Sequence, residues 1–222
     1  MKRALALPIP FELDAPRASV AKIEPFDLAA RCTIVALFTL LAVRIGADAI
    51  TTGRVTGLLL LASESLVVVL TVFRRTAGQV DRSFLARLFT TVSMLGPLAV
   101  RPATVAPLLN GDTTVAVSVV GLSIVIAGKL TIGRSFGLLP ANRGIVSSGI
   151  YGLVRHPIYA GYLITHAAFV AANPTVWNAS LIIVGDLALL CRAVREEATL
   201  ARDLEYRSYM QRVRWRVCPG LF

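Results

Sequence analysis

Cysteine and histidine are scarce in this 222-residue chain, and each shortage excludes a class of protein. The three cysteines, Cys32, Cys191 and Cys218, lie far apart and form no CxxC pair, so the sequence predicts neither a disulfide framework nor a zinc site. The two histidines, His156 and His166, are too few for a histidine-rich metal centre. We therefore expect no bound metal.

Charged residues are scarce as well. They make up 16% of the chain, whereas soluble domains carry about a quarter. Hydrophobic residues make up 55%, and the mean hydropathy is +0.70. A chain of this size has too little polar surface to cover so many apolar side chains, so a lipid bilayer is the expected solvent.

The chain is strongly basic: twenty arginines and three lysines outnumber the thirteen acidic residues, which gives a net charge of +10. A pI near 10.4 is also typical of nucleic-acid-binding proteins. Here, however, the basic residues lie between long apolar runs, as they do in the cytoplasmic loops of membrane proteins. We therefore favour a membrane protein over a nucleic-acid partner.

The apolar runs predict an all-α, polytopic integral membrane helical bundle with five or six transmembrane helices. The pair Asn173-Pro174 separates the last two runs, which we expect to form a C-terminal helical hairpin with a short first arm. An interfacial tail covers 191–222. The expected helices are about 31–50, 55–73, 84–100 and 114–132, followed by 158–172 and 175–190.

Basic loops predict the topology. Residues 74–84 and 133–157 are rich in arginine, and the positive-inside rule places both on the cytoplasmic face. Residues 1–30 contain four prolines and lack the apolar stretch of a signal peptide, so we expect a cytoplasmic N-terminal arm. With both termini inside, the number of crossings is even, and a bacterial cytoplasmic membrane is the expected location.

Three ionisable residues fall inside the predicted transmembrane helices: Arg44, Asp48 and Glu64. Such groups pair across helices or line a transport path. A non-enzymatic transporter or scaffold is therefore one possible function, although helix–helix contacts are the better explanation of these three residues.

The first chemically rich block is GIYGLVRHPIYAG at 149–161. Arg155, His156 and Tyr159 supply a fixed cation, a tunable imidazole and a phenol within five residues. Pro157 suits the first turn of a new helix, so this block places its charged groups at a helix N-terminus, where anions and nucleotides bind. The alternative is that Arg155 and His156 only mark the membrane interface.

The second block is RAVREEATL at 192–200. On one helix, Arg192 and Glu196 lie four residues apart and can pair, which leaves Glu197 to point toward another partner. A carboxylate at the membrane edge suits a cationic ligand, an amine or a ribose. The alternative is a solvated interfacial helix held by salt bridges.

Together, GxYxxVRHPxYxG, RxxxEExxL and the following tail with Tyr206, Tyr209 and Pro219 resemble the isoprenylcysteine carboxyl methyltransferase family, with phospholipid N-methyltransferases as wider relatives. The resemblance covers about 129–219. It implies an integral membrane methyltransferase that uses S-adenosylmethionine without a Rossmann domain, and no GxGxxG follows a strand-like run in this sequence. The chain is accordingly expected to divide into three parts: a cytoplasmic N-terminal arm at 1–30, transmembrane helices 1–4 at 31–132, and a cofactor-binding catalytic region at 133–222.

The resemblance also implies roles for individual residues. Arg192, Glu197 and His156 are the expected catalytic residues, and Leu200 and Tyr209 are expected to pack beneath the cofactor. The methyl acceptor is a lipophilic or small molecule. The expected cofactor-binding residues are Arg155, His156, Pro157, Tyr159, Gly161, Glu196 and Glu197.

A second enzyme class shares part of this pattern. Membrane lipid or sterol reductases that use NADPH also carry an RHPxYxG-like block and a tail similar to PGLF at 219–222. The adjacent pair Glu196-Glu197 is the methyltransferase form, and a reductase would carry a Lys-Tyr-Gly run where this chain has DLEY at 203–206. The methyltransferase is therefore the favoured expectation.

Overall fold

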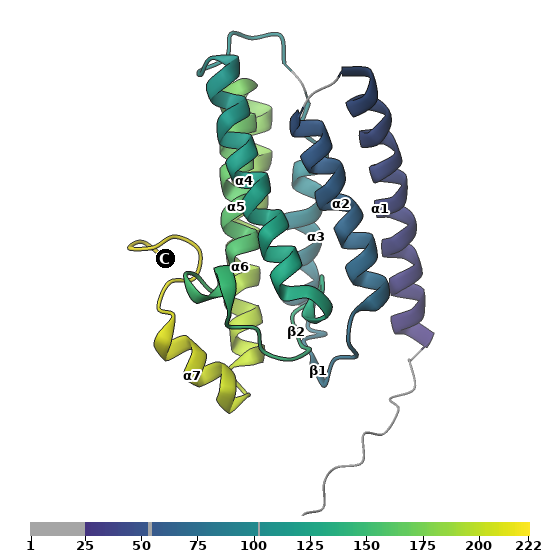
Figure 1. Cartoon of the computed structure of the whole chain (residues 1–222), viewed down its shortest axis with the longest axis vertical. Coiled ribbons are helices and arrows are strands. Elements are labelled where there is room, and N and C mark those ends of the chain that lie inside the picture. The colour runs from purple at the N-terminus through teal and green to yellow at the C-terminus, as the bar shows by residue number, and fades with distance from the viewer. Residues whose placement is uncertain (1–24, 53–54, 102) are drawn as a thin grey trace, which may run out of the picture.

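The structure is a computed structural model that describes residues 25–52, 55–101 and 103–222. Apart from one two-residue strand pair and two short 3-10 turns, its regular elements are α-helices, and six long helices run side by side (Figure 1). The helices are α1 (Pro25–Thr52), α2 (Val55–Phe73), α3 (Phe84–Leu98), α4 (Gly111–Ile132), α5 (Pro157–Ala172), α6 (Val176–Leu200) and α7 (Leu204–Arg212).

The helix positions follow the apolar runs of the sequence, with two corrections. Helix α1 begins at Pro25, so residues 25–30 belong to this helix and not to the predicted arm, whose remaining residues lie outside the described part. Helix α6 continues to Leu200, ten residues beyond the predicted end of the hairpin. Residues 191–200 are charged but contain no glycine or proline, so their polarity marks a change of surroundings and not the end of the helix.

Two helices, α4 and α6, are long and apolar enough to cross a membrane. The prediction of five or six transmembrane helices is not supported on this criterion. Within the described residues, the apolar parts of α1, α2, α3 and α5 are 10–17 residues long. A perpendicular crossing needs about 20 residues.

One end of the bundle gathers both arginine-rich loops. Strand β1 (Gln79–Val80) pairs antiparallel with strand β2 (Ala141–Asn142), and the Arg75 amide donates to the Arg134 carbonyl at 2.8 Å. Helix α7 lies at this same end (Figure 1). The loops at 74–84 and 133–157 therefore share one face, as the charge pattern predicted.

The opposite end is closed by asparagines. Asn173 accepts from the Ala103 amide at 2.9 Å, and Asn178 bonds both the amide and the carbonyl of Arg101. Asn110 caps α4 by accepting from the Thr113 amide. These bonds hold the α3–α4 connection against the turn of the α5–α6 hairpin.

Glycines bring α4 and α5 into close contact. A β-carbon on Gly161 would lie 2.6 Å from the Gly121 carbonyl oxygen, and one on Gly128 would lie 2.7 Å from the Ile158 side chain. Gly121 and Gly128 on α4 therefore allow the two helices to pack closely. This contact fixes the start of α5, which carries the first charged block, against the centre of the bundle.

Glu64 forms a helix–helix contact. The Lys129 ammonium on α4 lies 3.6 Å from Glu64 on α2 and donates to the Ser63 hydroxyl at 2.8 Å. The side chain of Lys129 is fully buried, so the pair is satisfied within the bundle. The side chains of Arg44 and Asp48 lie outside the described part.

Candidate functional site

The two charged blocks meet at the arginine-rich end of the bundle, around the carboxylate of Glu197. The Oε1 atom of Glu197 lies 2.9 Å from Arg155 Nε and 3.2 Å from His156 Nε2. Its other oxygen, Oε2, accepts from Arg216 Nε at 2.9 Å. Glu197 is only 5% exposed and His156 only 6%, so this ion cluster is shielded from solvent.

The local fold explains how these groups converge. His156 caps α5 and Pro157 occupies its first turn, as predicted, so Arg155 and His156 project from the start of the helix. Glu197 lies in the last turn of α6, one residue from Glu196. The ends of two helices joined by a hairpin are thus brought together at the same end of the bundle.

Tyr159 extends the cluster toward the second carboxylate. Its hydroxyl donates to Glu196 Oε2 at 2.7 Å, and its ring stacks on His156 with centroids 5.1 Å apart and planes 10° apart. Adjacent glutamates on a helix point in directions about 100° apart, which lets one bind the tyrosine while the other binds the cations.

Arg192 packs against the ring of Tyr159. Its guanidinium carbon lies 5.4 Å from the centroid of the Tyr159 ring, and Nη2 donates weakly to the Gly137 carbonyl at 3.3 Å. The side chain is 7% exposed, and its Nε has no hydrogen-bond partner in the described chain. A buried guanidinium with an unused donor is a suitable binding group for a carboxylate.

The C-terminal segment 213–222 covers the cluster, and sequence reasoning did not identify it. The amides of Arg155 and His156 donate to the carbonyls of Trp215 and Arg216, at 2.9 and 2.7 Å. The amides of the two residues before α5 are therefore bound to the C-terminal segment. Arg216 had no motif to mark it, because it is one of several arginines in a basic tail.

A layer of tyrosines supports the site from below. Tyr151, Tyr206, Tyr209 and Val213 form one buried cluster, with Leu200 packed against it. The Tyr209 hydroxyl donates to the Tyr151 carbonyl at 2.7 Å. Burial raises the pKa of Tyr209 to about 12 and that of Tyr206 further, so both phenols stay protonated at neutral pH.

Gly161 has a different place from the one its motif suggested. It faces Gly121 of α4, where an added β-carbon would collide with the carbonyl oxygen. Its lack of a side chain makes room for a neighbouring helix. We therefore assign Gly161 to helix packing instead of cofactor binding.

The charge balance of the site is close to neutral. Arg155, Arg192 and Arg216 contribute three positive charges, and Glu196 and Glu197 contribute two negative ones, which gives 3 − 2 = +1 for these five residues. Cationic donors and carboxylate acceptors therefore stand side by side in a buried setting. Such a set suits a zwitterionic ligand better than a simple anion or cation.

Comparison of the sequence with known protein families and with curated proteins found no match. The family resemblance therefore depends on the residues of the two blocks and on their arrangement.

Proposed function

We propose that this chain is an integral membrane S-adenosylmethionine-dependent methyltransferase acting on a lipophilic or small acceptor at the cytoplasmic face. The observation that carries the proposal is the contact between His156 and Glu197, which joins the two motif blocks in one buried cluster. Isolated interfacial salt bridges would be exposed, whereas these two side chains are almost fully buried.

The membrane location is supported by the outer surface of the helices. Large apolar side chains on α3 and α6 are exposed, among them Leu95 at 57% and Leu187 at 58%. Continuous apolar faces of this kind on several helices suit contact with lipid. We extend this to a multi-pass topology in which α1, α2, α3 and α5 also enter the bilayer, with the arginine-rich end in the cytoplasm.

The donor set fits S-adenosylmethionine. Glu196 suits the ammonium group or the ribose hydroxyls of the cofactor. The stacked rings of Tyr159 and His156 offer an aromatic surface for a sulfonium or an adenine. When bound, the cofactor supplies an electrophilic methyl group on a positively charged sulfur.

The protein's own residues orient the reactants and exclude water. Arg155, His156 and Arg216 already occupy both oxygens of Glu197, so this carboxylate holds the cluster together and fixes the position of His156. Arg192 can hold an acceptor carboxylate, in which case no base is needed. For a phenol, thiol or amine, His156 is the group that can take up the proton. Orientation supplies a large part of the rate gain in such transfers.

The test uses the full chain purified in detergent. We expect S-adenosylhomocysteine to raise the melting temperature, and labelled methyl groups from the cofactor to appear in a lipid or small-molecule extract. Stabilisation by NADPH alone would favour the reductase. Stabilisation by neither compound, with no labelled product, would leave the transporter or scaffold as the better hypothesis.

A further inference from the structure

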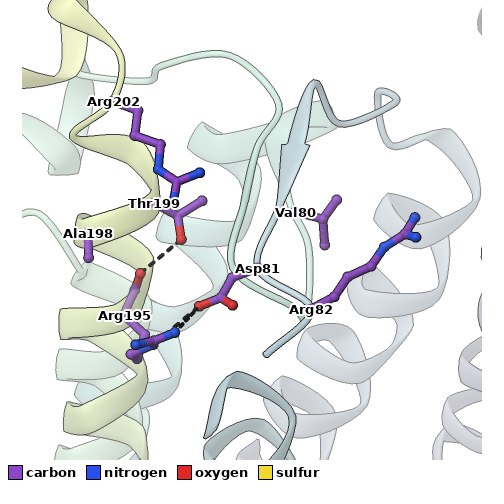
Figure 2. A pocket seen from close by; sticks show the side chains of 7 residues that line it. All are labelled: Val80, Asp81, Arg82, Arg195, Ala198, Thr199 and Arg202. Atoms are coloured by element: carbon purple, nitrogen blue, oxygen red, sulfur yellow. Dashed lines mark hydrogen bonds and ion pairs between the residues drawn. The ribbon is translucent and has the colours of Figure 1, made fainter. Parts of the chain in front are cut away.

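A polar cavity lies beside α6, and the ion cluster around Glu197 does not line it. Its volume is about 210 Å³. Figure 2 shows side chains of α6 on one side and those of β1 and the following loop on the other. The lining residues are Val80, Asp81, Arg82, Arg195, Ala198, Thr199 and Arg202.

Three arginines and one aspartate give this cavity a net charge of 3 − 1 = +2. Asp81 is bound to Arg195 by two hydrogen bonds, at 2.7 Å from Nη2 and 3.2 Å from Nε. Asp81 also accepts from the Ser83 amide at 2.9 Å. The one carboxylate is therefore neutralised by Arg195, and Arg202 contributes a further positive charge to the cavity.

Arg202 is the donor that the protein leaves available. Within the described part of the chain it makes no hydrogen bond or ion pair, and its guanidinium is directed toward the cavity in Figure 2. The Thr199 hydroxyl is engaged with the Arg195 carbonyl at 3.1 Å, so it is not a competing donor. Helix α3 begins two residues after Arg82, and its positive end adds to the field.

Exposed apolar side chains lie close in sequence to the residues that line the cavity. On α3, Phe84 is 75% exposed and Leu88 39%, and on α6 Val194 is 44% exposed. Phe84 follows Arg82 by two residues, and Val194 directly precedes Arg195. A ligand with an anionic head and apolar chains would therefore contact both kinds of surface at once.

We propose that this cavity binds the phosphate group of an anionic membrane lipid, with Arg202 as the donor and Arg195 held in place by Asp81. Arginine is preferred for phosphate because its planar guanidinium can donate two parallel hydrogen bonds. A soluble phosphate shares this chemistry, and the exposed apolar side chains favour the lipid as its source.

The experiment measures lipid binding by native mass spectrometry of the detergent-solubilised protein, with phosphatidylglycerol as the probe and phosphatidylcholine as the zwitterionic comparison. The variant is Arg202→Gln, which breaks no contact within the described chain. The matched control is Arg212→Gln, an exposed arginine of α7 outside the cavity. Thermal shifts with inorganic phosphate form a second arm.

We expect Arg202→Gln to weaken phosphatidylglycerol binding about tenfold, the factor that corresponds to one charge-assisted hydrogen bond. The control and the phosphatidylcholine complex should change little. Stabilisation by inorganic phosphate that also needs Arg202 would support the phosphate site with a soluble source. Equal losses in both variants, or no loss in either, would overturn the proposal.

The lipid site rests on the proposed membrane location but not on methyl transfer. A chain that fails to bind S-adenosylhomocysteine and still shows Arg202-dependent lipid binding would disprove the first proposal only.

Discussion

The Nε2 atom of His156 lies 3.2 Å from the Oε1 atom of Glu197, although 41 positions separate the two residues. The same oxygen lies 2.9 Å from Arg155 Nε. One carboxylate thus connects the start of α5 with the end of α6, and Arg216 adds the C-terminal segment to the same group. A substitution of Glu197 should therefore change both the stability of the protein and its ligand binding.

Replacing Glu197 with glutamine keeps its shape but removes its charge. We expect this variant to lose binding of S-adenosylhomocysteine, because Arg155 and His156 are no longer held in place. We also expect a loss of about 3 kcal/mol in the free energy of unfolding, since a buried guanidinium is left without its counter-charge. Thermal shifts with and without the ligand measure both effects.

Glu205→Gln is the matched control, because Glu205 is an exposed carboxylate on α7. It should keep both ligand binding and stability. Wild-type ligand affinity in the Glu197 variant would remove this carboxylate from the proposed cofactor site.

Tyr159 has two functions that two substitutions can separate. Tyr159→Phe removes the hydrogen bond to Glu196 but keeps the ring against Arg192 and His156. Tyr159→Leu removes both. We expect the first change to cost about 1–2 kcal/mol of ligand binding through the freed carboxylate, and the second to cost more through loss of the aromatic surface.

Isothermal titration with S-adenosylhomocysteine measures the difference between the two variants. Equal affinities would show that the ring takes no part in binding. An unchanged affinity in both variants would place Tyr159 in the core of the protein instead of in the site.

Several features could be predicted from the sequence because they depend on local patterns. The apolar runs located the long helices, and α2 matches its predicted range of 55–73. The proline after His156 located the start of α5. The adjacent positions of Glu196 and Glu197 predicted that the two carboxylates face different partners, and they do, although Glu196 accepts from Tyr159 where the sequence suggested Arg192.

Other features depend on contacts between distant segments, which no local pattern encodes. Arg216 binds Glu197 because residues 213–222 fold back over α5, and one arginine in a basic tail carries no sign of that path. Gly161 belongs to a motif that resembles a cofactor site, yet its actual neighbour is Gly121 on α4. The predicted number of five or six membrane crossings is not supported, because two helices of the described part meet the criterion of length and hydropathy.

The assignment of Gly161 to helix packing predicts a loss of stability for Gly161→Ala. The added carbon would lie 2.6 Å from the Gly121 carbonyl oxygen, and backbone atoms cannot yield without moving α4 or α5. We expect a cost of about 1–3 kcal/mol in the free energy of unfolding. Gly111→Ala, where nothing lies within 4 Å, is the control in α4. Equal melting temperatures for the two variants would contradict the packing assignment.

The pKa of Asp81, at the arginine-rich end of the bundle, predicts how the stability of the protein depends on pH. Burial by itself raises the pKa of Asp81, but hydrogen bonds from Ser83 and Arg195 outweigh burial and hold the pKa below its ordinary value. In the unfolded chain the ordinary pKa of an aspartate is about 3.9. The folded state therefore binds this proton less readily than the unfolded state does.

The contribution of Asp81 to stability is consequently complete above the unfolded pKa and is lost as the pH falls through the lowered folded value. We expect Asp81→Asn to lower the melting temperature at neutral pH and to flatten its decline between about pH 5 and about pH 2. The control is Asp112→Asn, an exposed aspartate in the first turn of α4. Thermal melts of the three proteins across this range measure the effect. A decline of unchanged steepness in the Asp81 variant would mean that its ion pair with Arg195 adds nothing to folding.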